Sequence, residues 1–448
     1  MGRLFGTDGV RGVANTELSC ELAMNIGRAA ATVLSKGMRR RPVFVVGTDT
    51  RISSDMLASS VTAGLCSVGA DVKLLDVVPT PAVAYLVGKY KADAGIMISA
   101  SHNPSEYNGI KVFSGDGYKL PDALEEQIEA MVLDGHGDFG FKPGSGVGKT
   151  NFVADAVKDY VEHLRSSVPN SLDGLRIGVD CANGSASVTA EKLFAALGAE
   201  AHIINADPDG ENINVNCGST HIEGLAAFVR ENGLDAGVAF DGDADRCLCV
   251  DERGNVIDGD EIMAICALDL AERGKLRKRT VVGTVLTNFG FGKFCDENDM
   301  RFVATKVGDR FVLEEMLLNE YDFGGEQSGH IIFRDYATTG DGQLTAIQLL
   351  SLMKRKGKKL SEMKLMTKYP QVSRNIRISG EAKVLYYTNA RIKEAVEAGK
   401  KTLGADGRVI VRPSGTEPLI RVMTEGLDIS LIDRVADEIA DVITAELG

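Results

Sequence analysis

Three acidic residues that can do chemistry gather at one point of the chain. Asp241, Asp243 and Asp245 alternate in DGDADR, directly after the apolar run LDAGVAF. On an extended backbone alternate side chains point the same way, so the three carboxylates are expected to face one another. Such clustering is costly without a cation, and three hard oxygen donors that leave room for water and a phosphate oxygen suit Mg²⁺ better than zinc. The cluster therefore predicts a Mg²⁺ site.

The acidic cluster has two other interpretations. A solvated acidic turn needs no ion and stays open. An EF-hand loop would place Glu252 at its twelfth position. The EF-hand interpretation fails because Arg246 stands where the sharp turn needs glycine, and because a strand rather than a helix precedes the loop.

A serine with chemical potential lies in SASHNP, which also follows an apolar run. Ser101 has His102 beside it, and Pro104 closes the turn. A hydrolase is disfavoured because adjacent side chains on extended backbone point apart and no G-x-S-x-G elbow surrounds the serine. A plain Asn-Pro turn stays open. The matching position of the aspartate cluster in the next repeat favours a phosphorylated serine, which supplies an oxygen to the metal and a transferable phosphoryl group.

The segment RPSGTEP near the C-terminus has the composition of a phosphate-binding loop. Small residues let backbone N–H groups wrap a phosphate, hydroxyls add hydrogen bonds, and arginines form planar charge-assisted pairs. The alternative is a β-hairpin connection with incidental charge. The predicted phosphate-binding residues are Arg412, Ser414, Gly415, Thr416 and Arg421.

A fourth loop, GGEQSGH, has side chains suited to a sugar. Glu326 and Ser328 are two apart, so on an extended segment they face one side and can grip vicinal hydroxyls or an amino group, while His330 handles a proton. A structural loop is the alternative. The same alternative, a salt-bridged loop residue, applies to Arg11 in GTDGVRG, Lys111 in NGIKVF, and Gly308, Asp309 and Arg310 in KVGDR.

The elements that must position these loops form three copies of one plan. Each copy has three β-branched runs separated by helical patterns, and the third run ends in polar residues. The runs lie at 41–51, 69–78 and 93–104, at 175–184, 198–207 and 235–246, and at 280–290, 300–309 and 321–330. Continuous Val/Ile/Ala runs with amphipathic crossovers indicate mostly parallel sheets, whose ligands sit beyond the carboxyl ends of the strands. The predicted class is α/β, with matching loops turned toward one shared cleft.

The domain boundaries follow from composition. The Gly/Pro-rich stretch 134–150 is a linker or loop, the polar turn 251–260 separates the second and third copies, and 368–375 follows the third. The tail has a different plan, two strands and a helix with one apolar stripe, typical of a smaller α+β domain. The predicted domains are 1–150, 151–252, 253–368 and 369–448.

Charge and composition exclude several classes of protein. The 448 residues carry a net charge of −13, so nothing draws the chain as a whole to nucleic acid or to an anionic membrane. Eight cysteines without a CxxC spacing indicate reduced thiols and a cytoplasmic location. The sequence opens without a charged-then-apolar signal pattern, and none of its apolar runs approaches membrane-spanning length, so neither a signal peptide nor a transmembrane helix is predicted. The oligomeric state stays open, a homodimer included.

The loops SASHNP, DGDADR, GEQSGH and RPSGTEP occur in this order, and together they resemble the α-D-phosphohexomutase family across the whole chain. The ordered set is highly specific. Within the family, the opening LFGTDGVRG and Gln327 in the sugar loop are similar to members that act on glucosamine phosphates rather than on mannose or glucose phosphates.

The resemblance implies four domains around a central cleft and a role for each loop. Ser101 would be the phosphorylated residue and would contact one Mg²⁺ together with Asp241, Asp243 and Asp245. Among the catalytic side chains, Lys111 and His330 would be the better acid/base candidates, near His102 and Arg11. The implied substrate-binding residues are Arg246, Gly308, Asp309, Glu326, Ser328, Arg412, Ser414, Gly415, Thr416 and Arg421.

The implied reaction converts glucosamine 6-phosphate to glucosamine 1-phosphate, through a sugar 1,6-bisphosphate that also acts as activator. A glucose or mannose phosphate as substrate is the nearest alternative. A metal-dependent phosphatase, which releases inorganic phosphate, and a non-catalytic sugar-phosphate sensor are the two other classes considered.

Overall fold

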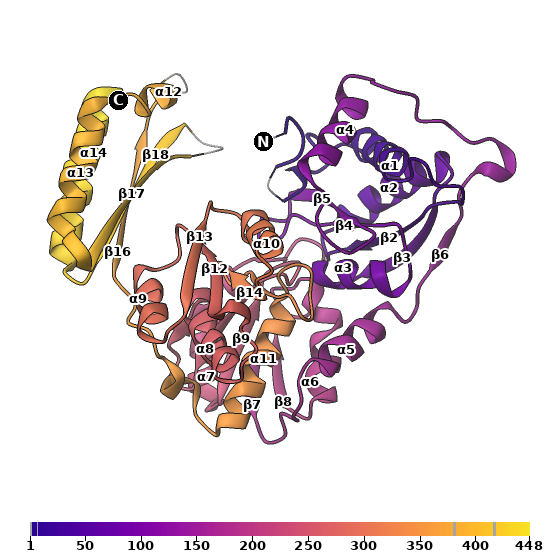
Figure 1. Ribbon diagram of the computed structural model, residues 1–448. Coiled ribbons are helices and arrows are strands. Elements are labelled where there is room, and N and C mark those ends of the chain that lie inside the picture. Colours follow the sequence, from indigo (N-terminus) through magenta and orange to yellow (C-terminus); the bar gives the residue numbers. More distant parts are fainter. Residues whose placement is uncertain (1, 7, 380–381, 415–417) are drawn as a thin grey trace. The chain divides into compact units, whose positions relative to one another are not determined.

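The computed structural model describes the chain except residues 1, 7, 380–381 and 415–417, and except the side chains of 383 and 384 (Figure 1). The chain divides into two compact units, which are described separately. One unit comprises Met1–Leu286 and Met300–Lys364, and the other comprises Thr287–Asp299 and Leu365–Gly448.

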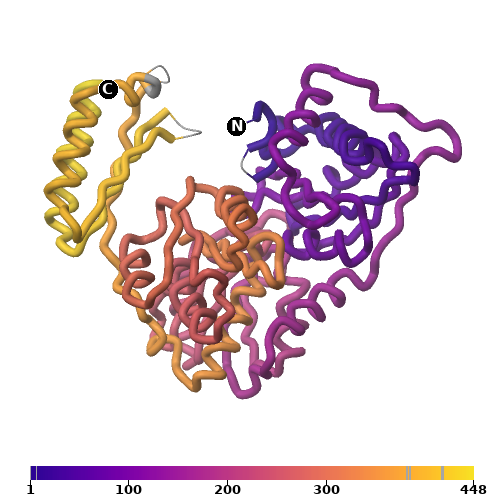
Figure 2. The backbone as a smooth tube through the Cα atoms, in the orientation of Figure 1, coloured from indigo at the N-terminus to yellow at the C-terminus, as the bar shows by residue number. Residues whose placement is uncertain are grey.

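The first unit has three sheets. The first has the order β1-β5-β4-β2-β3-β6. Its strands are β1 (Val10–Val13), β2 (Val43–Thr48), β3 (Asp71–Val77), β4 (Ala94–Ile98), β5 (Tyr107–Ser114) and β6 (Thr150–Phe152). The helices of this region are α1 (Cys20–Leu34), α2 (Ser54–Ser67), α3 (Thr80–Lys89) and α4 (Asp122–Leu133). Between α4 and β6 the chain forms a long loop, which Figure 2 shows, where the sequence predicts a linker or loop at 134–150. The strand β6 then pairs with β3 in parallel.

The second and third sheets have the orders β11-β10-β9-β7-β8 and β13-β12-β14-β15. Their strands are β7 (Arg176–Asp180), β8 (Glu200–Ile204), β9 (Ala236–Phe240), β10 (Cys247–Asp251), β11 (Val256–Ile257), β12 (Thr280–Thr284), β13 (Arg301–Thr305), β14 (Phe323–Gly325) and β15 (Ile331–Phe333). The accompanying helices are α5 (Ala156–Ser166), α6 (Ala190–Ala196), α7 (Glu223–Asn232), α8 (Gly259–Glu272), α10 (Asp309–Leu318) and α11 (Gly342–Lys356).

All three sheets repeat one strand order. In each, the first and third strands of the repeat pair in parallel, the second strand flanks the first, and an antiparallel fourth strand flanks the third. The central strands β4, β9 and β12 are buried along their whole length, as expected for strands between helical layers. The predicted threefold α/β repeat is confirmed, and its three polar loops are the equivalent connections between third and fourth strands.

The second unit has a small antiparallel sheet of order β16-β18-β17, from β16 (Gln371–Arg377), β17 (Gly407–Pro413) and β18 (Leu419–Gly426). Helices α9 (Phe289–Glu297), α12 (Ala382–Tyr386), α13 (Ala390–Leu403) and α14 (Ile429–Leu447) complete it. The helix α14 buries Ile432, Val435, Ile439, Ile443 and Leu447, and the two other residues of the predicted stripe, Leu431 and Val442, are partly buried against the same core. The smaller C-terminal α+β domain is thereby confirmed.

Within the described ranges, no helix combines the length and the apolar character needed to cross a bilayer.

Candidate active site

Three loops from three repeats meet in the first unit: 99–106 after β4, 241–246 after β9, and 326–330 after β14. The Ser101 hydroxyl donates to Asp241 Oδ2 over 2.7 Å. His330 Nδ1 lies 3.6 Å from Asp245 Oδ2. The equivalent connections of the repeats therefore build one site, because the carboxyl ends of the parallel strands are the ends that present these loops.

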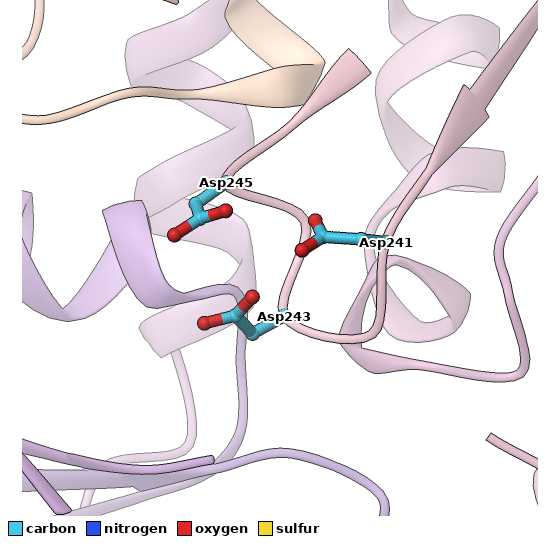
Figure 3. A group of neighbouring side chains, drawn as sticks. All are labelled: Asp241, Asp243 and Asp245. Carbon is cyan, nitrogen blue, oxygen red and sulfur yellow. The ribbon is translucent and has the colours of Figure 1, made fainter. Parts of the chain in front are cut away.

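The three aspartates converge, but not on the extended backbone that their spacing predicts. Residues 241–246 form a turn, in which Ala244 has a φ of 56°. Within the cluster, one carboxylate oxygen from each aspartate lies within 4.8 Å of the others, and Figure 3 shows the carboxylates of Asp241, Asp243 and Asp245 turned toward one another. The predicted grouping is correct and the stated reason was wrong: a turn, not alternation along a strand, gathers the carboxylates.

The donor set fits a divalent metal ion. All three aspartates are buried. Among the described residues, Asp243 Oδ1 and Asp245 Oδ1 are buried without a hydrogen-bond partner, which is costly unless a cation takes them. Burial, and then the neighbouring charges of Asp245 and Asp243, raise the pKa of Asp241 to about 8. Oxygen-only ligands of this kind suit Mg²⁺.

Lys111 is a cation that the fold itself places against the aspartate cluster. It lies on β5, is 2% exposed, and its Nζ is 2.8 Å from Asp243, 2.9 Å from Asp8 and 3.4 Å from Asp245. Burial lowers the pKa of Lys111, but Asp243 and Asp8 more than reverse this, so that the pKa is raised well above its usual value. Lys111 is therefore a charged hydrogen-bond donor in this arrangement.

Asp8 links the basic residues of the site and was not singled out from the sequence. Besides Lys111 it accepts from Arg11 at 2.5 Å and from Lys119 at 2.5 Å. Burial raises the pKa of Asp8, but these cations outweigh it and lower the pKa well below its usual value. Lys119 also pairs with Asp309. The signal for Asp8 was its place in GTDGVRG, whereas nothing near Lys119 in the sequence marks it.

Ser101 and His102 lie closer than extended backbone would allow. Ser101 has a φ of 55°, and its Oγ is 3.3 Å from His102 Nδ1. The assumption that the two adjacent side chains point apart was wrong, because the loop turns at Ser101. Burial, followed by the charges of Arg246 and Arg11, lowers the pKa of His102 to about 4. The imidazole is therefore neutral near pH 7.

The loop with Glu326 and Ser328 is also a turn and not extended. Gly329 N–H donates to Glu326 O over 2.9 Å, which closes the connection between β14 and β15. Glu326 Oε1 accepts from the backbone N–H of Gly308 at 3.1 Å. Burial, and then Asp309, raise the pKa of Glu326. Among described residues, Ser328 Oγ is buried without a hydrogen-bond partner, so a ligand hydroxyl or a water can occupy that position.

His330 is fully buried between backbone and carboxylates. Gly340 N–H donates to His330 Nε2 over 3.0 Å, which places the proton of the neutral ring on Nδ1, toward Asp245. Burial lowers the pKa of His330, but Asp309 and Asp245 shift it upward overall. Arg310 lies in a salt-bridged cluster with Asp122, Glu125 and Glu314, the structural alternative named for this residue.

Arg246 follows the aspartates and faces the same space. Its backbone N–H donates to Asp241 Oδ1 over 3.2 Å, and its Nε is 3.8 Å from Asp245 Oδ1. The side chain is 23% exposed, so its remaining donors can reach a ligand.

The fourth predicted loop belongs to the second unit. Arg412 on β17 and Arg421 on β18 are direct partners in the antiparallel register. Burial, and then the like charge of Arg421, lower the pKa of Arg412. The backbone N–H of Ser414 donates to Leu419 O over 2.8 Å. Gly415 and Thr416 lie outside the described residues. Two arginines side by side make a favourable seat for an anion.

Comparison with known proteins gives one consistent family. The models "Phosphoglucomutase/phosphomannomutase, alpha/beta/alpha domain" I, II and III match residues 2–136, 158–254 and 258–369, and the C-terminal domain model of the same family matches 374–442. Curated proteins named phosphoglucosamine mutase from Thermoanaerobacter sp. (strain X514) and Acetivibrio thermocellus are 53% and 52% identical to this chain, over all of both sequences.

Solved structures show the same fold. A phosphoglucomutase/phosphomannomutase family protein from Burkholderia thailandensis has a TM-score of 0.82 at 23% identity, covering 98% of this chain and 97% of that one. The N-acetylphosphoglucosamine mutase of Aspergillus fumigatus, solved with GlcNAc-6P and magnesium, has a TM-score of 0.70 at 17% identity and covers 99% and 95%. The chain therefore belongs to the phosphoglucomutase/phosphomannomutase family of isomerases, the α-D-phosphohexomutases, and within it is similar over its whole length to the phosphoglucosamine mutases.

Proposed function

We propose that this protein interconverts glucosamine 6-phosphate and glucosamine 1-phosphate and so feeds amino-sugar nucleotide synthesis. The single observation that carries the proposal is the hydrogen bond from Ser101 Oγ to Asp241 Oδ2, which places a nucleophilic hydroxyl against a cluster able to bind a divalent ion. The names of the full-length relatives support glucosamine as the sugar.

The transfer takes place in two steps, because the phosphates of substrate and product lie at opposite ends of the sugar. In the first, the 6-phosphosugar's 1-hydroxyl attacks the phosphorus of phospho-Ser101. A new sugar O–P bond forms, the Ser101 Oγ–P bond breaks, and the proton of the sugar hydroxyl is delivered to Ser101 Oγ, so that a 1,6-bisphosphate and a free serine hydroxyl result. After this intermediate turns over in the site, Ser101 Oγ attacks the phosphorus at the 6-position. The O6–P bond breaks, the serine proton passes to the 6-oxygen, phospho-Ser101 is restored and the 1-phosphosugar leaves.

Each side chain of the site has a proposed part in these steps. Asp241, Asp243 and Asp245 hold Mg²⁺, which when bound neutralises phosphoryl charge. Lys111 places a positive charge and a hydrogen bond on the bridging oxygen, since its raised pKa keeps it protonated. His330 exchanges a proton with the sugar hydroxyl. The side chains of Arg11, Arg246 and His102 surround the phosphoryl group, for which positioning and charge matter more than covalent chemistry.

Substrate binding is assigned to the remaining predicted residues. Glu326 and Ser328 bind the sugar hydroxyls or amino group, and Gly308 and Asp309 support Glu326 and His330. The phosphate that is not being transferred binds the fourth loop, where an anion relieves the repulsion between paired arginines. That loop comprises Arg412, Ser414, Gly415, Thr416 and Arg421.

We infer four functional domains at 1–150, 151–252, 253–368 and 369–448, with the fourth mobile enough to let the bisphosphate reorient. A cytoplasmic location is supported by eight cysteines that are all free thiols. A homodimer is compatible with the proposal, which does not depend on it.

The decisive test compares rates with glucosamine, glucose and mannose 6-phosphates, in the presence of Mg²⁺ and a catalytic amount of the matching 1,6-bisphosphate. The proposal predicts the highest kcat/KM with glucosamine 6-phosphate and no inorganic phosphate release. A higher kcat/KM with glucose or mannose 6-phosphate would reassign the substrate. Stoichiometric phosphate release would indicate a phosphatase, and binding without interconversion would indicate a sensor.

A further inference from the structure

The backbone carbonyl of Ser101 is enclosed by groups that the reaction scheme above does not use. Ser101 has a φ of 55°, a region that residues with a side chain rarely adopt, so the surrounding structure must hold this conformation. Its carbonyl oxygen accepts two hydrogen bonds, from Arg51 Nη2 at 2.9 Å and from Asn214 Nδ2 at 3.0 Å. Both donors come from distant parts of the chain.

Most hydrogen bonds of the Arg51 side chain go to the segment that carries Ser101, the loop 99–106 and the first residue of β5. Its side chain is fully buried, and its Nε donates to Asp49 Oδ2 over 2.9 Å, which fixes the plane of the guanidinium. Asp49 is in turn bound by the hydroxyls of Ser54 and Ser99. The Arg51 guanidinium nitrogens then donate to the carbonyls of Ser101, Asn103, Pro104 and Tyr107. The planar guanidinium of Arg51 therefore fixes the backbone conformation of the loop 99–106.

Asn214 makes the same connection from the second repeat. Its Nδ2 donates to Ser101 O at 3.0 Å and to Asn103 O at 3.3 Å. Its Oδ1 is buried and has no hydrogen-bond partner among the described residues, so the side-chain bonds of Asn214 run to this loop. Gly242, next to Asp241, closes the third side: a Cβ there would lie 2.6 Å from Ser101 O. The loop that carries the aspartates therefore packs directly against the backbone carbonyl of Ser101.

We propose that Arg51 and Asn214 are positioning residues, which hold the Ser101 backbone in its left-handed conformation and thereby aim Oγ at Asp241 and the incoming phosphoryl group. Neither side chain forms a hydrogen bond with Ser101 Oγ, whose described partners are Asp241 and His102. The inference rests on the proposed function, because it assigns these residues to the phosphorylation of Ser101. A displacement of a reacting atom by about 1 Å costs roughly 100-fold in rate. A small shift of this loop should therefore lower the rate of phosphoryl transfer more than it weakens substrate binding.

The test uses a substitution that replaces only the side-chain amide NH₂ group of Asn214. Asn214→Asp keeps the size of the side chain, removes both donors and turns an acceptor toward Ser101 O. Asn212→Asp is the matched control: it lies in the same loop, and its Nδ2 donates to Asp207 O at 3.0 Å rather than to the serine loop. Asn214→Ala removes the donors without burying a charge, and serves if the Asp variant fails to fold. Melting temperatures identify the folded variants.

The measurement is the rate at which Ser101 gains a phosphoryl group from glucosamine 1,6-bisphosphate, followed by quenched flow and intact mass. We expect Asn214→Asp or Asn214→Ala to slow this step and kcat by about 10- to 100-fold, with KM for glucosamine 6-phosphate within about twofold and the control unchanged. Phosphorylation of both folded Asn214 variants at the wild-type rate would overturn the inference, as would an equal loss in Asn212→Asp. Absence of phosphorylation in the wild type would instead refute the proposed function, and the inference with it.

Discussion

Ser101 and Asp241 are 140 positions apart in the sequence, yet the hydroxyl of one donates to a carboxylate oxygen of the other over 2.7 Å. Ser101 lies in the loop between β4 and β5, and Asp241 begins the loop between β9 and β10. Both loops join the third and fourth strands of their repeats. Because the two repeats have the same strand order, their equivalent loops face the same place. The predictions below follow from this contact and from the charges around it.

Substitution of the serine should stop turnover without unfolding the protein. Ser101→Ala removes the hydroxyl that accepts the phosphoryl group, so kcat is expected to fall by about 1,000-fold or more. Ser105→Ala, in the same loop, is the control and should keep wild-type kcat. Steady-state kinetics and thermal melting measure the two effects. Near-normal kcat in Ser101→Ala would remove the residue from the mechanism.

Binding of Mg²⁺ should release a proton near pH 7. Burial and the neighbouring aspartates raise the pKa of Asp241 to about 8, and a metal ligand must be ionised. Below pH 8 the apparent affinity for Mg²⁺ should therefore weaken as pH falls. Calorimetric titrations in two buffers with different ionisation enthalpies give the number of protons released. A value near zero at pH 7 would contradict the role of Asp241 as a ligand that starts protonated.

The metal-free protein should gain stability when Asp241 is made neutral, and the gain should depend on pH. The folded-state pKa of Asp241 is raised above its unfolded value, so its contribution to stability is present at low pH and is lost as pH rises toward 8. Asp241→Asn carries no such loss. Its advantage over the wild type, on the order of a few kcal/mol, should grow between pH 4 and pH 8.

Urea unfolding in EDTA across this pH range measures that advantage. A constant or shrinking difference between Asp241→Asn and the wild type would contradict the electrostatic description. Addition of Mg²⁺ should stabilise the wild type by about 2.7 kcal/mol at 100 times its Kd, and Asp241→Asn by less.

Loss of one arginine of the fourth loop should weaken binding. Arg421→Ala removes a charge-assisted bond to the substrate phosphate, and KM should rise by about 10- to 100-fold with a smaller effect on kcat. Arg374→Ala is the control, because this arginine lies on the neighbouring strand and is ion-paired with Asp433 and Asp437. An unchanged KM in Arg421→Ala would exclude Arg421 from phosphate binding.

Most of the fold could be predicted because it is repeated and strongly patterned. The buried runs of β4 and β9 are continuous in the sequence, and each is followed by the polar loop of its repeat; in the third repeat the equivalent loop follows the short buried strand β14. The apolar stripe of α14 was equally clear. Residue type and position in the repeat were enough to group Ser101, the three aspartates and His330.

The conformation of the loops could not be predicted in the same way. Positive φ at Ser101 and Ala244 is imposed by tertiary contacts, and neither residue type favours it. Extended backbone was therefore assumed where the structure has turns. Arg51 and Asn214 were missed for a related reason: each acts on a backbone carbonyl far away in the sequence, and a carbonyl leaves no signal in residue type.

Intact mass analysis with peptide mapping, before and after incubation of the wild type with glucosamine 1,6-bisphosphate, tests the central claim most directly. The account predicts that one phosphoryl group appears on the peptide with Ser101, and that glucosamine 6-phosphate then removes it. An unchanged mass, or a phosphoryl group on any other residue, would contradict it.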